Sequence, residues 1–115
     1  MSGHNIYTFK FNEMYKLYTA KIERKGRLSA ELDEVVCWLT GYTSEDLHNM
    51  NADCDMTSFF ENAPTLNPNR DLIKGSICGV KLAEIEEPLM KEIRYLDKLV
   101  DELAKGKAMD KILRK

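Results

Sequence analysis

"EEPLMKEIRYLDKLVDELAKG", residues 86–106, contains the clearest helical pattern of this 115-residue chain. Pro88 suits the first turn of a helix, where its missing N–H leaves no hydrogen bond unmade. The apolar residues that follow recur at spacings of four, three, four and three: Leu89, Ile93, Leu96, Val100 and Leu103. This period places them on one stripe of a helix. The stripe is only about two heptads long, too short for a coiled coil that stands alone. We therefore predict a long C-terminal helix that faces the core of a globular domain.

Three pairs of opposite charge lie four residues apart on the outer face of this helix, a spacing that supports helices: Glu87/Lys91, Lys98/Glu102 and Asp101/Lys105. Gly106 interrupts the helix, and an amphipathic tail follows with Met109, Ile112 and Leu113. We expect these apolar residues to dock the tail on an acidic surface of this chain or of a neighbour, with residues 28–69 as the acidic stretch. Basic residues surround them: Lys107, Lys111, Arg114 and Lys115. A frayed terminus is the alternative.

The first helix on the N-terminal side is predicted over residues 13–25, capped by Asn12 and ended by Gly26 in the left-handed conformation. Its apolar residues recur at helical spacing: Phe11, Met14, Tyr15, Tyr18 and Ile22. Before it, residues 7–11 alternate like a short strand, but an isolated strand has nothing to pair with. A short extended N-terminal segment is therefore left open.

A second helix is predicted from the cap Ser29 to Gly41, which ends it in the left-handed conformation. Its buried stripe contains Leu32, Val35, Val36 and Leu39. Thr43 or Ser44 then caps a short third helix. We also predict that Trp38 is mostly buried and that its indole N–H finds a partner. Helix-turn-helix DNA readers have a similar joint, but the segment after this glycine is acidic, and phosphates would repel it. DNA binding through residues 38–50 is therefore not expected.

A fourth helical turn is predicted over residues 57–61, followed by the proline-punctuated loop ENAPTLNPN. Asn67 and Pro68 form the cap and first position of a fifth helix that runs toward Ile77. The stretch ICGVKL, residues 77–82, could instead be extended and pair with the N-terminal segment. The sequence as a whole thus predicts a mainly all-α fold, a compact bundle of about five to six helices with a long C-terminal helix, in a single domain over residues 1–115.

Charge is distributed unevenly along the chain. Residues 1–27 carry six basic residues against two acids, residues 28–69 carry eight acids and no base, and residues 70–115 carry eleven basic residues against nine acids. An acidic middle between basic ends either neutralises itself in the fold or offers a two-sign surface to a protein partner or a second copy. No apolar stretch approaches the roughly 18 residues that cross a bilayer, no signal peptide is visible, and the three cysteines form no close pair. We expect a cytoplasmic protein that does not enter a membrane.

Motifs of known chemistry do not match. The stretch NADCDMTSFFEN, residues 51–62, spaces oxygen ligands like a calcium loop, but Met56 and Asn62 replace the required glycine and glutamate. No histidine–cysteine spacing fits zinc, so neither a metal nor a cofactor is expected. Cys78 could act as a nucleophile, although a buried cysteine more often serves as a small hydrophobe.

Two function classes follow. The first is a binding or adaptor protein that uses a surface, favoured by the split charge and the basic tail. The second is a small-molecule or phosphate-binding protein, an enzyme included, that uses a basic pocket. Guanidinium groups bind anions in pairs of hydrogen bonds, and the candidate residues for such a pocket are Arg24, Lys25, Arg27, Arg70 and Lys74.

Five stretches carry a resemblance to a known family: ERKGR, WLTGY, FFENAPTLNPNR, LIKGSICGV and IEEPLMKEIRYLDKLVDELAKGKAMDKILRK. With them the chain resembles the bacterial family catalogued as domain of unknown function 2200, over residues 6–115. The resemblance implies a small, single-domain, largely helical cytosolic protein. It carries no activity, substrate or binding residue over to this chain.

Overall fold

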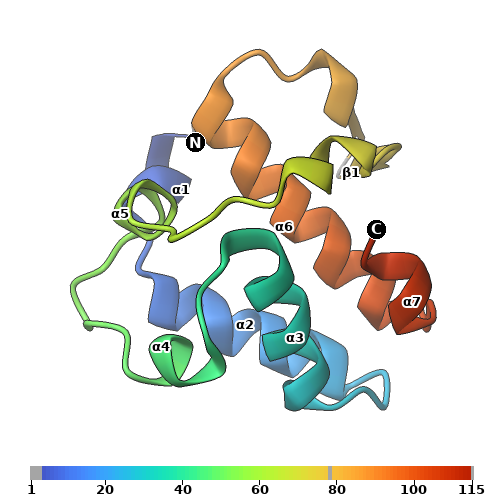
Figure 1. Ribbon diagram of the computed structural model, residues 1–115, viewed down its shortest axis with the longest axis horizontal. Coiled ribbons are helices and arrows are strands. Elements are labelled where there is room, and N and C mark those ends of the chain that lie inside the picture. The colour runs from blue at the N-terminus through green and yellow to red at the C-terminus, as the bar shows by residue number, and fades with distance from the viewer. Residues whose placement is uncertain (1–3, 78, 115) are drawn as a thin grey trace.

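The computed structural model describes residues 4–77 and 79–114 of the chain. Within these residues it contains seven α-helices, two short 3₁₀ helices and one hairpin of two short strands. Their bounds, in chain order, are α1 (His4–Thr8), α2 (Phe11–Glu23), α3 (Ser29–Thr40), α4 (Ser44–His48), α5 (Met56–Glu61), η1 (Pro68–Leu72), β1 (Ser76–Ile77), β2 (Val80–Lys81), η2 (Leu82–Glu84), α6 (Pro88–Ala104) and α7 (Met109–Ile112). The fold is mostly helical with a long C-terminal helix, as predicted (Figure 1). The prediction about Cys78 lies outside the described residues.

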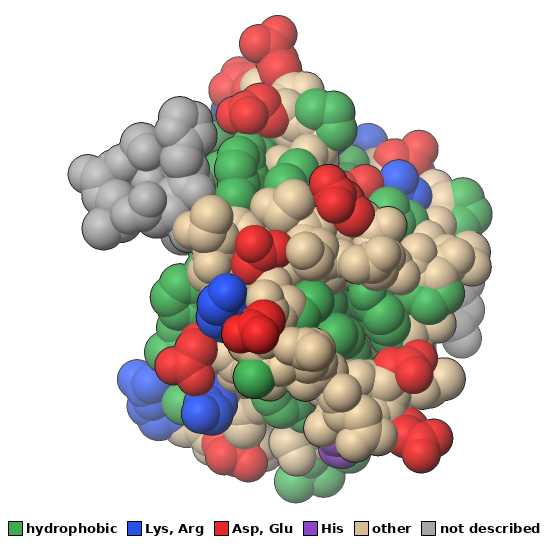
Figure 2. All heavy atoms as spheres, turned by 90° about the vertical axis from the view of Figure 1, so that its left-hand side faces the viewer, with side chains coloured by type: hydrophobic (Ala, Val, Ile, Leu, Met, Phe, Trp, Pro, Cys, Tyr) green, Lys and Arg blue, Asp and Glu red, His purple; other side chains and the backbone are tan. Residues whose placement is uncertain are grey.

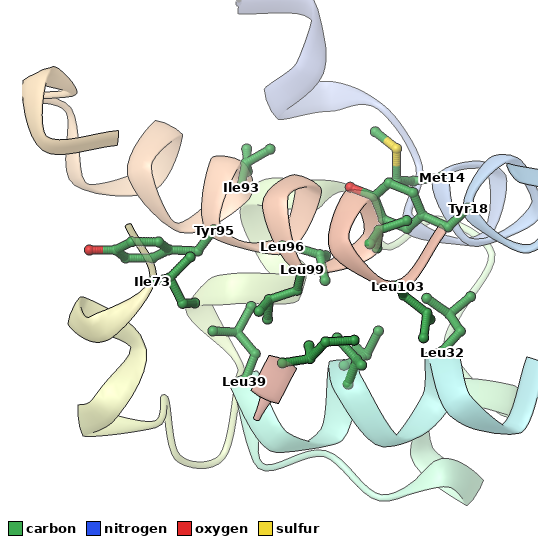
Figure 3. Packing of buried hydrophobic residues seen from close by; sticks show 14 of the residues in the cluster. Met14, Tyr18, Leu32, Leu39, Ile73, Ile93, Tyr95, Leu96, Leu99 and Leu103 are labelled. Carbon is green, nitrogen blue, oxygen red and sulfur yellow. The ribbon is translucent and has the colours of Figure 1, made fainter. Parts of the chain in front are cut away.

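Helix α6 crosses the molecule, and α2 and α3 pack against it and against each other (Figure 1). Four of the five residues of the predicted stripe are fully buried, and Leu89 packs at the edge of the core. Figure 3 shows Leu103 of α6 close to Leu32 of α3, and Leu99 between α6 and Leu39. Each buried aliphatic side chain of this kind contributes roughly 1.5–3 kcal/mol to folding. The 3.6-residue period of one helix therefore determines where the core lies.

The charge pairs on α6 are only partly as predicted. The Asp101 carboxylate lies 3.1 Å from the Lys105 ammonium group, so this pair forms. The other two pairs do not form. Glu87 accepts a hydrogen bond of 3.0 Å from the Tyr7 hydroxyl of α1, and Glu102 is buried and faces the tail. Tertiary contacts thus override the local spacing rule at both positions.

The alternating stretch at the N-terminus is helical over α1, so the extended segment left open by the sequence is not formed there. Only Lys10 makes a bridge of the strand type, with Asp55. The chain then enters α2 at Phe11, whose ring stacks on Phe59 of α5 at a centroid distance of 4.1 Å. Asn12 therefore lies inside the helix, and the prediction that it is the cap is wrong. Phe11 is drawn into the core, and the helix starts with it.

At the start of α3 the predicted cap is also wrong, because Ser29 is itself the first helical residue. The residue before it takes the cap position, and its N–H donates to a Glu31 carboxylate oxygen at 3.0 Å. The far end of α3 is as predicted, with Gly41 at a φ of 81°. The cap of α4 is Thr43, whose hydroxyl accepts from the N–H of Asp46 while the Asp46 carboxylate accepts from the N–H of Thr43. Local capping rules thus determine this corner.

Trp38 is partly buried at the edge of the core. Among the described residues no acceptor for its indole N–H is found, so this half of the prediction is not confirmed. The backbone of Trp38 is instead the contact point, because the Asn67 amide donates to its carbonyl oxygen at 3.1 Å.

The predicted fifth helix is wrong beyond its first turns. Asn67 caps it as predicted, but it is a 3₁₀ helix that ends at Leu72. Gly75 has a φ of 99°, which a continuing helix does not allow. The chain then forms the antiparallel hairpin β1–β2, with Ser76 opposite Lys81. The extended alternative was correct in type, but the strands pair with each other and not with the N-terminal segment.

The tail docks on its own chain, in the short helix α7 and the residue after it. Ile112 is fully buried and Leu113 is nearly so. Arg114 binds both carboxylate oxygens of Glu102, at 2.7 and 2.8 Å, and the Lys107 ammonium group lies 3.3 Å from the same carboxylate. The tail therefore docks on its own chain, as one of the two predicted alternatives. Its acidic partner, however, lies on α6 and not in the predicted acidic stretch of residues 28–69. Lys115 lies outside the described residues.

None of the helices within residues 4–77 and 79–114 combines the length and the apolar character needed to cross a bilayer.

Candidate functional site: a pocket between the hairpin and helix α6

A cavity of about 440 Å³ opens between α6 and residues 71–76 and 81–83, which include the end of η1, parts of both hairpin strands and the start of η2. We call it the hairpin pocket. Its floor is apolar and consists of the buried residues Ile73, Leu82 and Tyr95, which we call the apolar floor. Figure 3 shows the Tyr95 ring extending from α6 beside Ile73, with its hydroxyl at the outer end. Small-molecule sites are typically concave and apolar, with volumes of roughly 300–1,000 Å³. The hairpin pocket is thus of ligand size.

Three lysines line the pocket, Lys74, Lys81 and Lys91, and we call them the lysine triplet. In the part of the chain that the structure describes, none of the three forms an ion pair. The acidic residue among those that line the pocket is Asp71, so the formal charge of the lining is positive. Like charges gathered in a cavity with low-dielectric walls focus a positive potential there. The pocket therefore favours an anion.

Tyr95 supplies a hydrogen-bond donor at the pocket. Burial raises the pKa of its phenol, the carboxylates of Glu92 and Asp71 raise it further, and Arg70 opposes them. The raised pKa keeps the hydroxyl protonated at neutral pH. Ser76 of β1 adds a second hydroxyl to the lining. Two neutral donors thus stand beside the lysine triplet.

The wall that carries η1 is fixed to α6 by Arg70. Its Nε donates to both carboxylate oxygens of Glu92, at 2.8 and 3.0 Å, and its Nη1 donates to the Asn67 carbonyl at 2.8 Å. Through Nε and Nη1, Arg70 joins α6 to the backbone before η1, so it positions this wall of the pocket. The sequence analysis proposed Arg70 for anion binding. In the structure its contacts are with Glu92 and the Asn67 backbone, so its role is structural.

The two groups of sequence candidates are not brought together. Arg27 forms a forked ion pair with Glu31 and donates to the carbonyl oxygens of Leu103 and Lys107, at the C-terminal end of α6. Arg70 contacts α6 eleven residues earlier, at Glu92, a separation of about 16 Å along the helix axis. Positive groups at a helix C-terminus are favourable, so Arg27 acts as a structural cap.

Of the other candidates, Arg24 and Lys25 are exposed beyond the end of α2 and line none of the cavities described here. Lys74 alone among the five candidates lines the hairpin pocket. Sequence reasoning missed Lys81, Lys91 and Tyr95. The one available signal was that the last two lie off the apolar stripe of α6 and four residues apart, which places them on one face of the helix.

A second cavity of about 370 Å³ adjoins the hairpin pocket and shares Asp71, Lys91 and Tyr95 with it. Its remaining charged residues include Glu86 and the ion pair between Arg70 and Glu92. This neighbour is therefore more acidic, and a ligand that spans both cavities would meet positive charge at one end only.

A polar cluster joins α2, α3 and α4 on another side of the molecule. The buried carboxylate of Asp33 accepts hydrogen bonds from the hydroxyl of Tyr15 at 2.5 Å and of Ser44 at 3.0 Å, and Nε2 of His48 lies 2.8 Å from it. The serine and the histidine both bond to the aspartate and not to each other, so they do not form a nucleophile–base pair. Burial raises the pKa of the neighbouring Cys37 thiol, and Asp33 adds to this effect, which is the opposite of an activated nucleophile. The cluster satisfies a buried charge and holds three helices together.

The loop over residues 51–62 uses its oxygen atoms for backbone turns. The Asp55 carboxylate accepts from the N–H of Ser58 at 2.8 Å, and the Asn51 side chain accepts from the N–H of Asp53 at 2.7 Å. In residues 4–77 and 79–114 no group of three histidine, cysteine, aspartate or glutamate side chains is placed to hold a metal ion.

Comparison with known proteins gives the family of the chain. The family model of domain of unknown function 2200, described as "uncharacterized protein conserved in bacteria", matches residues 5–114. The fold is also similar to a crystal structure of "uncharacterized protein SP1917", with a TM-score of 0.91 and 46% sequence identity over 98% of this chain and 93% of the other. No curated protein matches the chain. Since the family model covers nearly its whole length, this protein belongs to the bacterial family of domain of unknown function 2200.

Proposed function

We propose that this protein is a binding protein that captures a small ligand in the hairpin pocket. The observation that carries the proposal is a cavity of about 440 Å³ with an apolar floor and several polar groups converging on it. A site of this kind is the default binding site of a small protein. The proposal revises the sequence-based expectation of a basic pocket, because only Lys74 of the predicted residues contributes to it.

A surface that docks another protein is the second candidate function. Two large apolar residues next to the pocket are exposed, Leu72 at 45% and Val80 at 43%. Figure 2 shows the side of the molecule where α1 and α5 lie, away from the hairpin, and acidic side chains are spread over that face. An exposed apolar patch with a polar rim marks interaction sites. In this case Leu72 and Val80 would be the anchors, and no small ligand would occupy the hairpin pocket.

A cytoplasmic location is part of the proposal. The two cysteines that the structure describes, Cys37 and Cys54, are free thiols, which suits a reducing compartment. Cell fractionation with an antibody against the chain tests this directly.

Saturation-transfer NMR with a mixture of small aromatic acids, alcohols, amines and phosphates tests the binding proposal. Ala83 lines the pocket and is exposed, so Ala83→Trp should fill the cavity without disturbing the core. Ala30, exposed on α3 and absent from the lining of the cavities described here, provides the matched control Ala30→Trp. We expect saturation transfer to at least one compound in the wild type and in Ala30→Trp, and its loss in Ala83→Trp. Equal transfer in all three proteins, or none in any, would contradict the proposal.

A further inference from the structure

We infer that the ligand of the hairpin pocket is a phosphate monoester with an aromatic or aliphatic body. The lysine triplet binds the phosphate, and the apolar floor binds the body. This inference rests on the proposed function and adds the chemical class of the ligand.

The charge balance of the pocket points to a head group with more than one negative charge. Three lysines stand against Asp71 alone, which leaves a formal charge of +2 on the lining. Like charges held in one cavity repel each other unless an anion balances them. A phosphate monoester carries about −1.5 to −2 at neutral pH, which is close to the charge that the pocket lacks. A single carboxylate would leave part of it uncompensated.

The kinds of donor in the pocket also suit phosphate. Lysine binds phosphate as a point charge that adapts its geometry, whereas arginine prefers forked contacts. The arginine nearest to the pocket, Arg70, is already held by Glu92. The hydroxyls of Ser76 and Tyr95 add neutral donors, and the raised pKa of Tyr95 keeps its proton in place. The lining thus offers five side-chain donors to an acceptor with three oxygens.

The apolar floor determines that the ligand has more than a phosphate group. Ile73 and Leu82 are each 2% exposed and Tyr95 is 6% exposed, so the floor belongs to the packed core. The apolar surface that still meets water around it comes from exposed Ala83 and from the methylene groups of exposed Lys74 and Lys81. Inorganic phosphate would leave this surface wet. An aromatic or aliphatic body would cover it, with a gain of roughly 25 cal/mol for each Å² of apolar area removed from water.

The shape of the region explains how a body and a head group are placed. The lysine triplet comes from three elements or their flanks: Lys74 precedes β1, Lys81 ends β2, and Lys91 lies in the first turn of α6. The hairpin is closed by the register that sets Ser76 opposite Lys81 and by a hydrogen bond of 2.9 Å from the N–H of Leu82 to the carbonyl of Gly75. Hairpin and helix therefore carry the charged groups around an apolar floor that both share.

Binding of three probes tests the inference by isothermal titration or NMR titration. Phenyl phosphate has both the head group and the body, benzyl alcohol has only the body, and inorganic phosphate has only the head group. We expect phenyl phosphate to bind with a Kd of about 1 mM or less, as ligand efficiency allows for so small a molecule. The other two probes should bind about tenfold more weakly or worse.

Variants of the lysine triplet locate the head group. Lys74→Gln, Lys81→Gln and Lys91→Gln should each weaken the binding of phenyl phosphate by about threefold, which lies in the upper part of the range for an exposed charge pair. The same variants should leave the binding of benzyl alcohol unchanged. Lys25→Gln removes the same charge from an exposed position that lines none of the cavities described here, and should have no effect. Lys25, Lys74 and Lys81 are exposed and Lys91 is half-buried, and none of the four forms an ion pair within the described residues, so none of these variants should unfold the protein.

The outcomes separate the two proposals. If benzyl alcohol binds as tightly as phenyl phosphate and Ala83→Trp blocks both, the pocket is confirmed and the phosphate inference is overturned. If inorganic phosphate binds as tightly as phenyl phosphate, the apolar body is overturned. Equal weakening by Lys25→Gln would show a general charge effect and would also overturn the inference. If Ala83→Trp changes the binding of no probe, the proposed function itself fails.

Discussion

At the residue scale, two constraints meet at Gly41. Its φ is 81°, and a Cβ atom there would lie 2.7 Å from the backbone nitrogen of Thr65. Gly26 has a φ of 82° but no atom within 4 Å of the same position. We expect Gly41→Ala to lower the free energy of unfolding by about 3 kcal/mol and Gly26→Ala by about 1 kcal/mol, because only the first adds a clash to the cost of a positive φ. Urea denaturation of both variants measures the difference. Equal losses would show that Thr65 moves away freely.

Glu102 is a residue at which burial and ion pairing compete. Burial acts to raise the pKa of its carboxyl, but the hydrogen bonds and charges of Arg114 and Lys107 outweigh burial and lower the pKa below its usual 4.5. A pKa that is lower in the folded state gives a contribution that is complete above about pH 4.5 and is lost as the pH falls through the folded-state value.

We therefore expect Glu102→Gln to cost about 3 kcal/mol at pH 7, because the Arg114 guanidinium loses its buried partner. The cost should be smaller at pH 3, because below about pH 4.5 the contribution of the ionised carboxylate falls as the pH approaches its folded-state pKa. Urea titrations of both proteins at the two pH values test this. A cost that is the same at pH 7 and pH 3 would mean that shape and not charge explains the effect.

The residue scale also shows what could be predicted from sequence and what could not. Gly41 and Thr43 follow rules that involve the next few residues only, so their roles were predictable. Glu102 was placed on the outer face of its helix because Lys98 lies four residues before it. Its true partner, Arg114, lies twelve residues away and reaches it only because the chain turns back. Asp33 escaped notice for the same reason, since its partners come from two other helices, α2 and α4.

At the element scale, the short helix α7 depends on its apolar contacts with the core. Ile112 is fully buried, whereas Leu28 is 66% exposed at the start of α3. We expect Ile112→Ala to cost about 3 kcal/mol, as a core deletion that leaves a cavity, and Leu28→Ala to cost less than about 0.5 kcal/mol. Thermal and urea unfolding measure both. A tail that contributes nothing would make the two variants equal.

The same helix gives a prediction about salt. Arg114 and Lys107 hold Glu102 through charge, and the screening length shortens to about 4 Å at 0.5 M salt. The N–H groups of residues 111–113 are hydrogen-bonded, so we expect them to be protected from hydrogen exchange at low salt and to keep part of that protection at 0.5 M, because Ile112 stays buried. Exchange at the rate of an unfolded chain at low salt would show that α7 does not dock.

Among the elements, length separates those that were predictable. Helix α6 repeats its apolar period often enough to fix both its type and its buried face. The segment from η1 to η2 consists of elements of two to five residues, in which no period can establish itself. Its structure comes from the bend at Gly75 and from the fixing of η1 by Arg70, which depends on Glu92 in another element. The hairpin pocket lies in this segment, so the sequence could not locate it.

At the scale of the whole molecule, folding divides the basic residues between structure and surface. Arg70 and Arg114 each hold two segments together through a carboxylate, and Arg27 does so through the backbone carbonyls of Leu103, in α6, and of Lys107, beyond its end. The lysine triplet remains without such partners in the described part of the chain, and the fold gathers it from positions 74, 81 and 91 into one cavity. The sequence could show that these residues were basic. Only the three-dimensional arrangement separates the arginines that hold the fold from the lysines that face the pocket.

A titration with phenyl phosphate, followed by amide chemical shifts, shows whether the hairpin pocket binds a ligand. We expect saturable amide chemical-shift changes confined to residues 71–83 and to the first two turns of α6, around Lys91 and Tyr95. The same titration of Ala83→Trp should leave the chemical shifts of these amides unchanged. Chemical-shift changes concentrated on α4 and α5, or changes that grow without saturation across the whole surface, would show that the ligand does not bind in the hairpin pocket.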